Sequence, residues 1–465
     1  MKSDRCPRLV ICVATTALAL CSVPAMADVV ISTEATQNMS CSGGICAPTA
    51  SDAVLNTTDI ENMLASGPLT VTTTGSGVQA SNIDVTAAFL WSAANTLTLD
   101  ANQSITVSAR VTDSGDGGVS LVTNDGGSGE ALSFLTGGNI TISSDKDRLT
   151  INGEAYTLEK DIAGLAHDIV AHPKGRFALA NDYDAKQNKL FRSPPIPVEF
   201  AGTLNGLGHA IRNVEIGDIS DMEVGVFAGL ASPGTISSIG LQNIVVQSGA
   251  HDADVGGLVG VVTGGAVQNS WVSGRIQGDF VGGLVGTVSS GAISNSWSSA
   301  QVRGYDAGGL VGGSEGEIEN SFASGTVVGA DEAGGLVGAS GGDGRIANSY
   351  ATGVSKALSG AIAGGLVGVN ASVSSSYSTG QVKGVVGAQV GGFIGYNPGT
   401  IENCVWDTTT SKTKIGVGGG FRTGLRGLTT RELRSRLPKG FDPSIWAEDA
   451  AINNGFPYLI ANPPQ

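Results

Sequence analysis

The pentapeptide Gly256-Gly257-Leu258-Val259-Gly260 decides the fold, because it returns at regular intervals along the chain. The copies are spaced by 26, 26, 26 and 30 residues, and a variant, Gly391-Gly392-Phe393-Ile394-Gly395, follows after 27 more. Periods of 20–50 residues indicate solenoids, propellers or other arrays. The repeated positions are Gly256, Gly257 and Leu258; Gly282, Gly283 and Leu284; Gly308, Gly309 and Leu310; Gly334, Gly335 and Leu336; and Gly364, Gly365 and Leu366.

A second block keeps the same period and identifies the repeat as strand-forming. It reads aliphatic-x-Asn-Ser-aromatic, as in Val267-Gln268-Asn269-Ser270-Trp271. Apolar residues alternate at period two in both blocks, and no helical 3.6-residue pattern is present. A propeller blade needs roughly 40 residues, whereas about 26 residues suffice for a rung of three short strands. We therefore predict an all-β chain folded as a right-handed parallel β-helix, a β-solenoid with rungs about 4.8 Å apart.

Stacked rungs place equivalent residues in columns. We expect the repeated leucines and Phe393 to form one inward column, with the flanking glycines at corners, where positive φ angles would exclude a side chain. The asparagines of the second block form another column: Asn269, Asn295, Asn320 and Asn348. The aromatic column contains Trp271, Trp297, Phe322, Tyr350 and Tyr377. If these rings point inward they are core, which strand parity favours; if they point outward they form a platform for sugars.

The N-terminus has the pattern of a secretory signal peptide, residues 1–27. Lys2, Arg5 and Arg8 precede the apolar stretch 9–23, and Ala25-Met26-Ala27 supplies the small residues of a cleavage site. Cleavage would leave 23 basic and 40 acidic residues, a net charge of −17. Such an acidic chain is not expected to bind nucleic acid. No other stretch is apolar enough for a transmembrane segment, so we expect a secreted or surface location.

Glycine supplies 70 of the 465 residues, in register with aliphatic residues, so the composition indicates repeated turns rather than disorder. Three cysteines lie beyond the signal. Cys41 and Cys46 bracket a short turn and are candidates for a disulfide in an oxidising compartment. Cys404 is expected to be a buried free thiol.

Five regions are expected along the chain. They are the signal peptide 1–27, a β-rich region 28–157, a helix–strand connector 158–199, the repeat solenoid 200–411 and a C-terminal cap 412–465 that covers the open end. The short helix between the halves is predicted from apolar spacing within 158–171. A further helix start is predicted where Thr429 and Glu432 have capping-box spacing.

One acidic set recurs shortly before the Gly-Gly pairs: Asp254, Asp279, Asp306, Asp331 and Glu332. A solvated acidic corner is the favoured interpretation, and a calcium site is the weaker alternative. The four histidines are scattered and are expected to be solvated. No hydrolase, zinc or phosphate-binding motif is found, so neither catalytic residues nor a cofactor are assigned.

The repeat Gly-Gly-Leu-Val-Gly…Ile-x-Asn-Ser-Tyr…Thr-Gly-x-Val resembles the GLUG motif of bacterial surface proteins. The N-terminal half resembles the filamentous haemagglutinin family of adhesins, on the stretches 104–107, 121–127 and 149–153. These resemblances imply a non-enzymatic, secreted or surface adhesin. Its partners would be a host or neighbouring-cell surface, a matrix protein or a glycan.

The alternative is a polysaccharide-active β-helix enzyme, a lyase or hydrolase. Such enzymes use clustered carboxylates with a basic partner. The acidic cluster in the less regular region comprises Asp145, Asp147, Asp182 and Asp184, near Arg148, Lys174 and Arg176. Assays on acidic polysaccharides distinguish the two hypotheses.

Overall fold

The structure is a computed structural model that describes residues 28–464, apart from 124, 126–131, 145, 147, 343, 359–361 and 370–371. Strands account for 51% of it and helices for 7%, and the strands form a parallel β-solenoid of about 14 turns. The predicted fold class is confirmed. The expected signal peptide, residues 1–27, lies outside the described residues.

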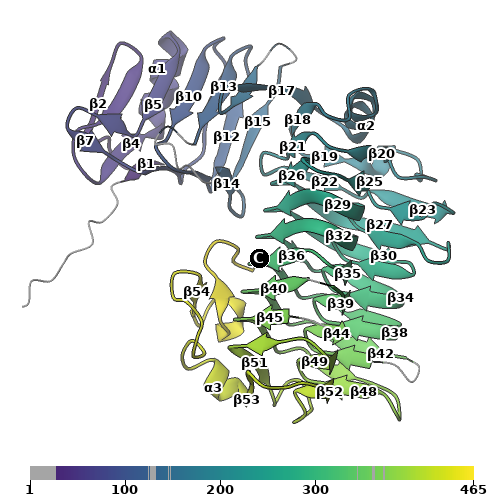
Figure 1. Cartoon of the computed structure of the whole chain (residues 1–465). Coiled ribbons are helices and arrows are strands. Elements are labelled where there is room, and N and C mark those ends of the chain that lie inside the picture. The colour runs from purple at the N-terminus through teal and green to yellow at the C-terminus, as the bar shows by residue number, and fades with distance from the viewer. Residues whose placement is uncertain are drawn as a thin grey trace, which may run out of the picture.

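The N-terminal body is a three-faced solenoid in which strands of successive turns pair in parallel (Figure 1). One face contains β1 (Asp28–Ser32), β4 (Ala53–Asn56), β8 (Asn82–Val85), β11 (Ile105–Val107) and β14 (Leu132–Phe134). The second contains β5 (Leu69–Thr72), β10 (Thr96–Asp100), β13 (Gly118–Val122) and β16 (Leu149–Ile151). The third contains β9 (Phe89–Trp91), β12 (Arg110–Asp113) and β15 (Asn139–Ile142).

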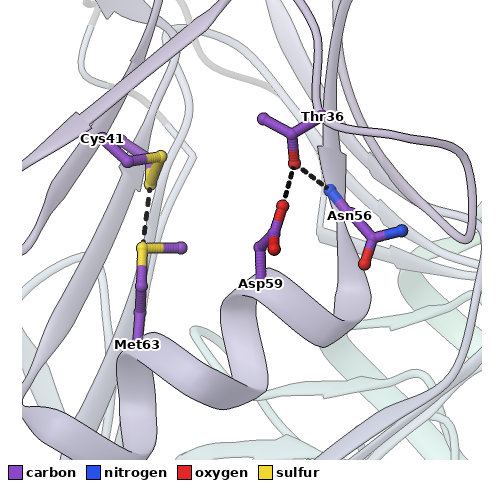
Figure 2. Close-up of a disulfide and its surroundings, with 6 residues drawn as sticks. Thr36, Cys41, Asn56, Asp59 and Met63 are labelled. Atoms are coloured by element: carbon purple, nitrogen blue, oxygen red, sulfur yellow. Dashed lines mark hydrogen bonds between the residues drawn. A yellow bond between two sulfur atoms is a disulfide. The ribbon is translucent and has the colours of Figure 1, made fainter.

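The helix α1 (Thr57–Ser66) was not predicted in this body. Asn56 caps it by accepting from Thr58 N, and Ile60 and Leu64 are fully buried. The disulfide Cys41–Cys46 joins β2 (Met39–Ser42) to β3 (Ile45–Pro48), and the Cys46 sulfur lies 3.7 Å from that of Met63 on this helix (Figure 2). The helix therefore covers the end of the apolar core next to the disulfide.

The C-terminal solenoid begins after an antiparallel turn between β16 and β17 (Glu154–Glu159). β17 pairs in parallel with β18 (Arg176–Leu179), and parallel pairing then continues to β52 (Val417–Gly420) and β53 (Leu425–Leu428). The rungs therefore extend beyond the range 200–411 that the repeats delimit. The predicted helix between the halves is α2 (Ile162–Ala171), capped by Asp161.

The repeat sets the register of the rungs. One rung contains β28 (Asp254–Gly256), β29 (Val259–Gln268) and β30 (Trp271–Gln277). The next contains β31 (Phe280–Gly282), β32 (Val285–Ser294), β33 (Trp297–Ser298) and the start of β34 (Gln301–Gly308). Residues of the two rungs pair with partners 26 positions apart, Val259 with Val285 and Trp271 with Trp297. Leu258, Leu284, Leu310, Leu336, Leu366 and Phe393 are all fully buried. They form the inward column.

The reason for the paired glycines differs from the prediction. None of the Gly-Gly residues of the repeat has a positive φ. A Cβ at Gly308 would instead lie 1.8 Å from the carbonyl oxygen of Val311, and one at Gly309 would lie 2.1 Å from that of Gly335. Glycine is therefore required by close backbone approach within and between rungs. The prediction of positive φ at these corners was wrong.

The left-handed residues are the asparagines of the second block. Asn269, Asn295, Asn320 and Asn348 have φ of 45–50°, a region that asparagine tolerates better than most residues. The serine that follows each of these asparagines is fully buried: Ser270, Ser296, Ser321 and Ser349. Ser376, which follows Ser375 in the next rung, is fully buried as well.

These serines form a hydrogen-bonded ladder through the solenoid. Ser270 N donates to Ser296 Oγ at 3.1 Å, and Ser296 N donates to Ser321 Oγ at 3.2 Å. Each hydroxyl in turn donates to the carbonyl two residues earlier, as Ser321 Oγ does to Glu319 O at 2.7 Å. Cys404 takes the same position in a later rung, where its sulfur lies 3.2 Å from Glu402 O and burial raises the pKa of its thiol to about 12. Cys404 is thus a buried free thiol with a structural position.

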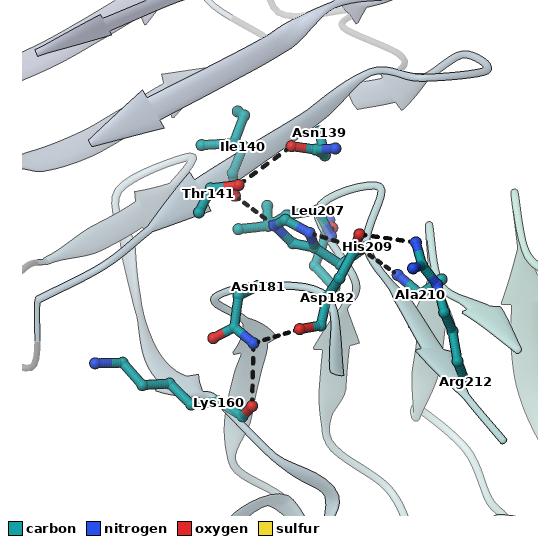
Figure 3. A network of polar contacts seen from close by, with 11 residues as sticks. Asn139, Ile140, Thr141, Lys160, Asn181, Asp182, Leu207, His209, Ala210 and Arg212 are labelled. Atoms are coloured by element: carbon teal, nitrogen blue, oxygen red, sulfur yellow. Dashed lines mark hydrogen bonds and ion pairs between the residues drawn. The ribbon is translucent and has the colours of Figure 1, made fainter. Parts of the chain in front are cut away.

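The two bodies meet at an elbow built from backbone and side-chain hydrogen bonds. β15 donates from Ile140 N to Leu207 O at 3.1 Å and from Ile142 N to Ala180 O at 2.9 Å. His209 bridges the same elbow, with Nε2 2.9 Å from Ile140 O and Nδ1 3.2 Å from Asp182 (Figure 3). The N-terminal body is therefore held at an angle to the longer solenoid (Figure 1).

The C-terminal segment 429–464 lies within the region that was expected to form a cap. Thr429 and Glu432 form the predicted capping box at the start of α3 (Thr430–Leu433). The segment then folds back along one side of the solenoid, and its end reaches the middle of the rod (Figure 1). It covers the aromatic column, an outward-facing row of large apolar rings that the segment shields from water.

Candidate functional site

The aromatic column is a continuous stack of parallel rings. Centroids of successive rings lie 4.8–5.7 Å apart and their planes differ by 3–8°. Phe322, Tyr350 and Tyr377, with Trp297 packed against them, form a cluster with residues of the C-terminal segment, separate from the core inside the solenoid. This part of the column therefore forms a second apolar core on the outside of the solenoid. Neither of the two sequence alternatives, inward core or exposed platform, describes it fully.

Burial along the stack is uneven. Tyr377, Tyr350 and Phe322 are 0–3% exposed, because the C-terminal segment packs over them. Trp446 lies 5.7 Å from Tyr377 between ring centroids, and the Tyr377 hydroxyl donates to Pro457 O at 2.6 Å. Burial raises the pKa of Tyr377 well above its ordinary value. Trp271 and Trp297, at the other end of the stack, are partly exposed.

These two tryptophans border a pocket where three parts of the chain converge. The N-terminal body contributes the turn 134–138, the solenoid contributes its corner residues, and the C-terminal segment contributes 461–463. Asn462 fixes the last of these, since its Nδ2 donates to Asn320 O at 3.0 Å and lies 3.4 Å from Ser296 O. We call this pocket the tryptophan slot. Its lining residues are Phe134, Leu135, Thr136, Gly137, Gly138, Gly208, Ser238, Asn269, Trp271, Asn295, Trp297, Ala461, Asn462 and Pro463.

Trp271 is the terminal ring of the stack. The residue in register with it on the preceding rung is Gly240, and a Cβ there would lie 2.3 Å from the indole. The outer face of the indole therefore meets backbone and the slot instead of another side chain. The column pattern in the sequence identified both tryptophans, but it could not bring in residues 134–138 or 461–463, which arrive through the elbow and the folded-back segment.

The acidic residues of the repeat do not form one column. Asp254 is in register with Phe280, which is in register with Asp306, so Asp279 is displaced from the row. Asp254 accepts a hydrogen bond from Thr287. Asp279 accepts from Asp252 N at 2.8 Å and lies 3.2 Å from the exposed His251. Ligand atoms of His251, Asp252 and Asp279 lie within 4.8 Å of one another at the surface.

Within this repeated acidic set, Asp306 and Glu332 lie in register on consecutive rungs. Burial, together with the nearby Asp331, raises the pKa of Asp306 to about 6. Burial and the charge of Asp306 raise the pKa of Glu332 to about 7. Each keeps one buried carboxyl oxygen without a hydrogen-bond partner in the described structure. This part of the acidic corner is therefore less solvated than the favoured interpretation assumed.

The acidic cluster proposed for an enzyme is only partly visible. Asp145 and Asp147 lie outside the described residues. Asp182 accepts from Ala210 N at 3.0 Å and pairs with Arg212 at 3.1 Å. The hydrogen bond from His209 is the main reason why the pKa of Asp182 falls to about 2. Asp184 accepts from Lys186 N at 3.0 Å and from Asn213 at 2.8 Å.

Basic residues of that hypothesis lie elsewhere, and one histidine contradicts the sequence interpretation. The guanidinium of Arg176, on β18, forms an ion pair with the carboxylate of Glu154, on the neighbouring β17, at 3.3 Å. His167, His172 and His251 are exposed as expected, but His209 is only 1% exposed. Both of its ring nitrogens face oxygen atoms, Nε2 the carbonyl of Ile140 and Nδ1 the carboxylate of Asp182. His209 joins the two bodies, and sequence spacing could not show this.

Comparison with known proteins supports the repeat architecture. A model described as the GLUG motif matches residues 304–328. Halomucin of Haloquadratum walsbyi is 36% identical over 80 residues, which is 17% of this chain and 1% of that protein. The chain thus spans about one-hundredth of the length of this curated relative. A solved structure, a candidate immunoglobulin A1 protease from Bacteroides ovatus, aligns at 20% identity and a TM-score of 0.42, over 66% of this chain and 93% of the other.

Among the described residues, no helix has the length and apolar character needed to cross a membrane.

Proposed function

We propose that this chain is a non-enzymatic, adhesin-like bacterial protein, secreted or held at the outer cell surface. Its solenoid presents a rigid surface to a host or neighbouring cell, a matrix protein or a glycan. The observation that carries this proposal is the regular stacking of the rungs. The serine ladder inside and the aromatic stack outside fix consecutive rungs in one register.

Rigid solenoids bind partners through extended surfaces built from many rungs. The C-terminal segment reinforces the rod by covering the aromatic column, while the opposite faces of the solenoid stay open (Figure 1). The exported location is supported by the signal-like N-terminus and by the Cys41–Cys46 disulfide, which persists in oxidising compartments. The resemblance to GLUG repeats of surface proteins points the same way.

The test is binding of the purified exported chain to arrays of mammalian and bacterial cells, matrix proteins and glycans. We expect saturable binding to at least one of them. Reducing-end and lyase assays on neutral and acidic polysaccharides run beside it, and we expect no turnover. Absence of binding on every array contradicts the adhesin proposal, and turnover of a polysaccharide contradicts its non-enzymatic part.

A further inference from the structure

The tryptophan slot differs from the rest of the aromatic column because its rings are not sealed. Phe322, Tyr350 and Tyr377 are covered by the C-terminal segment, whereas Trp271 and Trp297 remain partly exposed. The segment does extend this far, since residues 461–463 border the slot. It stops short of covering the indoles, and the turn 134–138 forms the opposite wall.

The slot offers a flat apolar surface. Of the glycines that line the slot, Gly137 faces open space, because nothing lies within 4 Å of the position that a Cβ would take there. The face of an indole is electron-rich and favours contact with positively polarised hydrogen atoms. A ring that presents C–H groups on one side fits this surface.

The polar groups around the slot are uncharged. Asn269, Asn295, Asn462 and Ser238 supply amide and hydroxyl groups, and none of the lining residues is acidic or basic. Ser238 is 4% exposed, and its Oγ has no hydrogen-bond partner in the described structure; the same holds for Asn295 Oδ1. Buried polar atoms without partners are uncommon in native proteins and call for an explanation.

We propose that the tryptophan slot binds a neutral sugar ring. The apolar face of a pyranose would lie against Trp271, and its hydroxyl groups would pair with the amides and with Ser238 after a small adjustment of these side chains. A neutral ring fits a lining without counter-charges, whereas an acidic sugar would enter a chain of net charge −15 without a cation to meet it. This inference rests on the proposed adhesive function and names the ligand class and site within it.

The experiment measures binding to an array of neutral oligosaccharides of glucose, galactose, mannose and N-acetylhexosamines, with sialylated and uronate glycans alongside. Three variants of the full chain are compared with the parent. Trp271→Ala removes the platform. Thr136→Arg places a long side chain at the exposed rim without touching the ring stack. Tyr305→Ala is the matched control, an aromatic residue 48% exposed and outside the lining of the slot.

We expect the parent to bind a neutral glycan and both slot variants to raise its Kd about tenfold or more, which corresponds to about 1.4 kcal/mol. Tyr305→Ala should bind like the parent. Thr136→Arg keeps the test valid even if Trp271→Ala is poorly folded. Binding that is unchanged in both slot variants, or restricted to acidic glycans, overturns the slot while the adhesin proposal stands. The same holds if the parent binds cells or matrix proteins but no neutral glycan, whereas absence of all binding overturns both.

Discussion

Asp306 and Glu332 occupy the same position on consecutive rungs, on β34 and β38 (Val327–Gly334), so two carboxyl groups lie next to each other in a partly buried row. Their pKa values rise to about 6 and about 7, because burial and the negative charge of neighbouring carboxylates disfavour ionisation. A carboxyl whose folded-state pKa is raised favours the fold at low pH. For Glu332, this stabilisation is lost as the pH rises from 4.5, the ordinary pKa of the side chain, through about 7, its pKa in the folded protein.

Glu332→Gln should therefore raise the melting temperature at pH 8 and have little effect at pH 4. Partial exposure screens the pair, so we expect about 1 kcal/mol. Melting curves between pH 4 and 8 measure this, with Glu317→Gln, an exposed carboxyl of the same solenoid, as the control. Millimolar Ca²⁺ should leave the parent unchanged. A calcium-dependent rise in the parent that Glu332→Gln abolishes would instead support the calcium alternative.

The serine ladder predicts a loss of stability when one of its hydroxyl groups is removed. Ser321→Ala removes the hydroxyl that accepts from Ser296 N and leaves that buried N–H without a partner. An unsatisfied buried donor costs about 1–3 kcal/mol. Denaturant unfolding should show this loss, and Ser324→Ala, an exposed serine three residues on, should show almost none. Equal stability of the two variants would mean that the ladder hydroxyls add nothing to the rod.

The repeat predicted the fold well because its information is local. Period-two alternation and the 26-residue spacing place Leu310 inside and Trp297 in register with Trp271. The prediction of positive φ for the repeat glycines was wrong. A recurring glycine can mark either a positive φ or a close approach of backbone atoms, as at Gly308, and the sequence does not distinguish the two. Contacts between distant segments were beyond prediction. Nothing in the period indicates that Asn462 reaches back to Asn320, or that His209 reaches Ile140.

The elbow predicts a dependence of shape on His209. His209→Phe keeps an aromatic ring at this position but removes the hydrogen bonds to Ile140 and Asp182. The N-terminal body should then sample a wider range of angles, visible in small-angle X-ray scattering as a larger radius of gyration. Faster proteolysis near residues 134–144 is expected as well. His172→Phe, on an exposed histidine, serves as the control and should scatter like the parent.

The same elbow should loosen in acid. The pKa of Asp182 is lowered to about 2, so its contribution is present above the ordinary value near 3.8 and is lost as pH falls through 2. Scattering of the parent should expand below about pH 3, and Asp182→Asn should show the expanded form already at pH 7. If Asp182→Asn stays compact at pH 7, the backbone hydrogen bonds of β15 are sufficient to hold the elbow.

The inward column predicts a large loss of stability when one of its leucines is truncated. Leu310 is fully buried between Leu284 and Leu336 of the adjacent rungs. Leu284 N donates to Leu310 O, and Leu310 N donates to Leu336 O. Leu310→Ala removes the transfer free energy of the side chain and leaves a cavity, so the expected cost is about 2–5 kcal/mol. The melting temperature of the whole repeat block should fall, because each rung is stabilised by its neighbours on both sides.

Two further variants separate burial from backbone crowding and from the acidic corner. Gly308→Ala should cost at least as much as Leu310→Ala, since its Cβ would lie 1.8 Å from Val311 O and the backbone of the rung would have to move. Asp306→Ala, two residues earlier, should be neutral or stabilising at pH 8, because it removes a carboxylate that burial disfavours. If Leu310→Ala melts like the parent while Asp306→Ala unfolds the solenoid, the acidic corner and not the leucine column organises the fold.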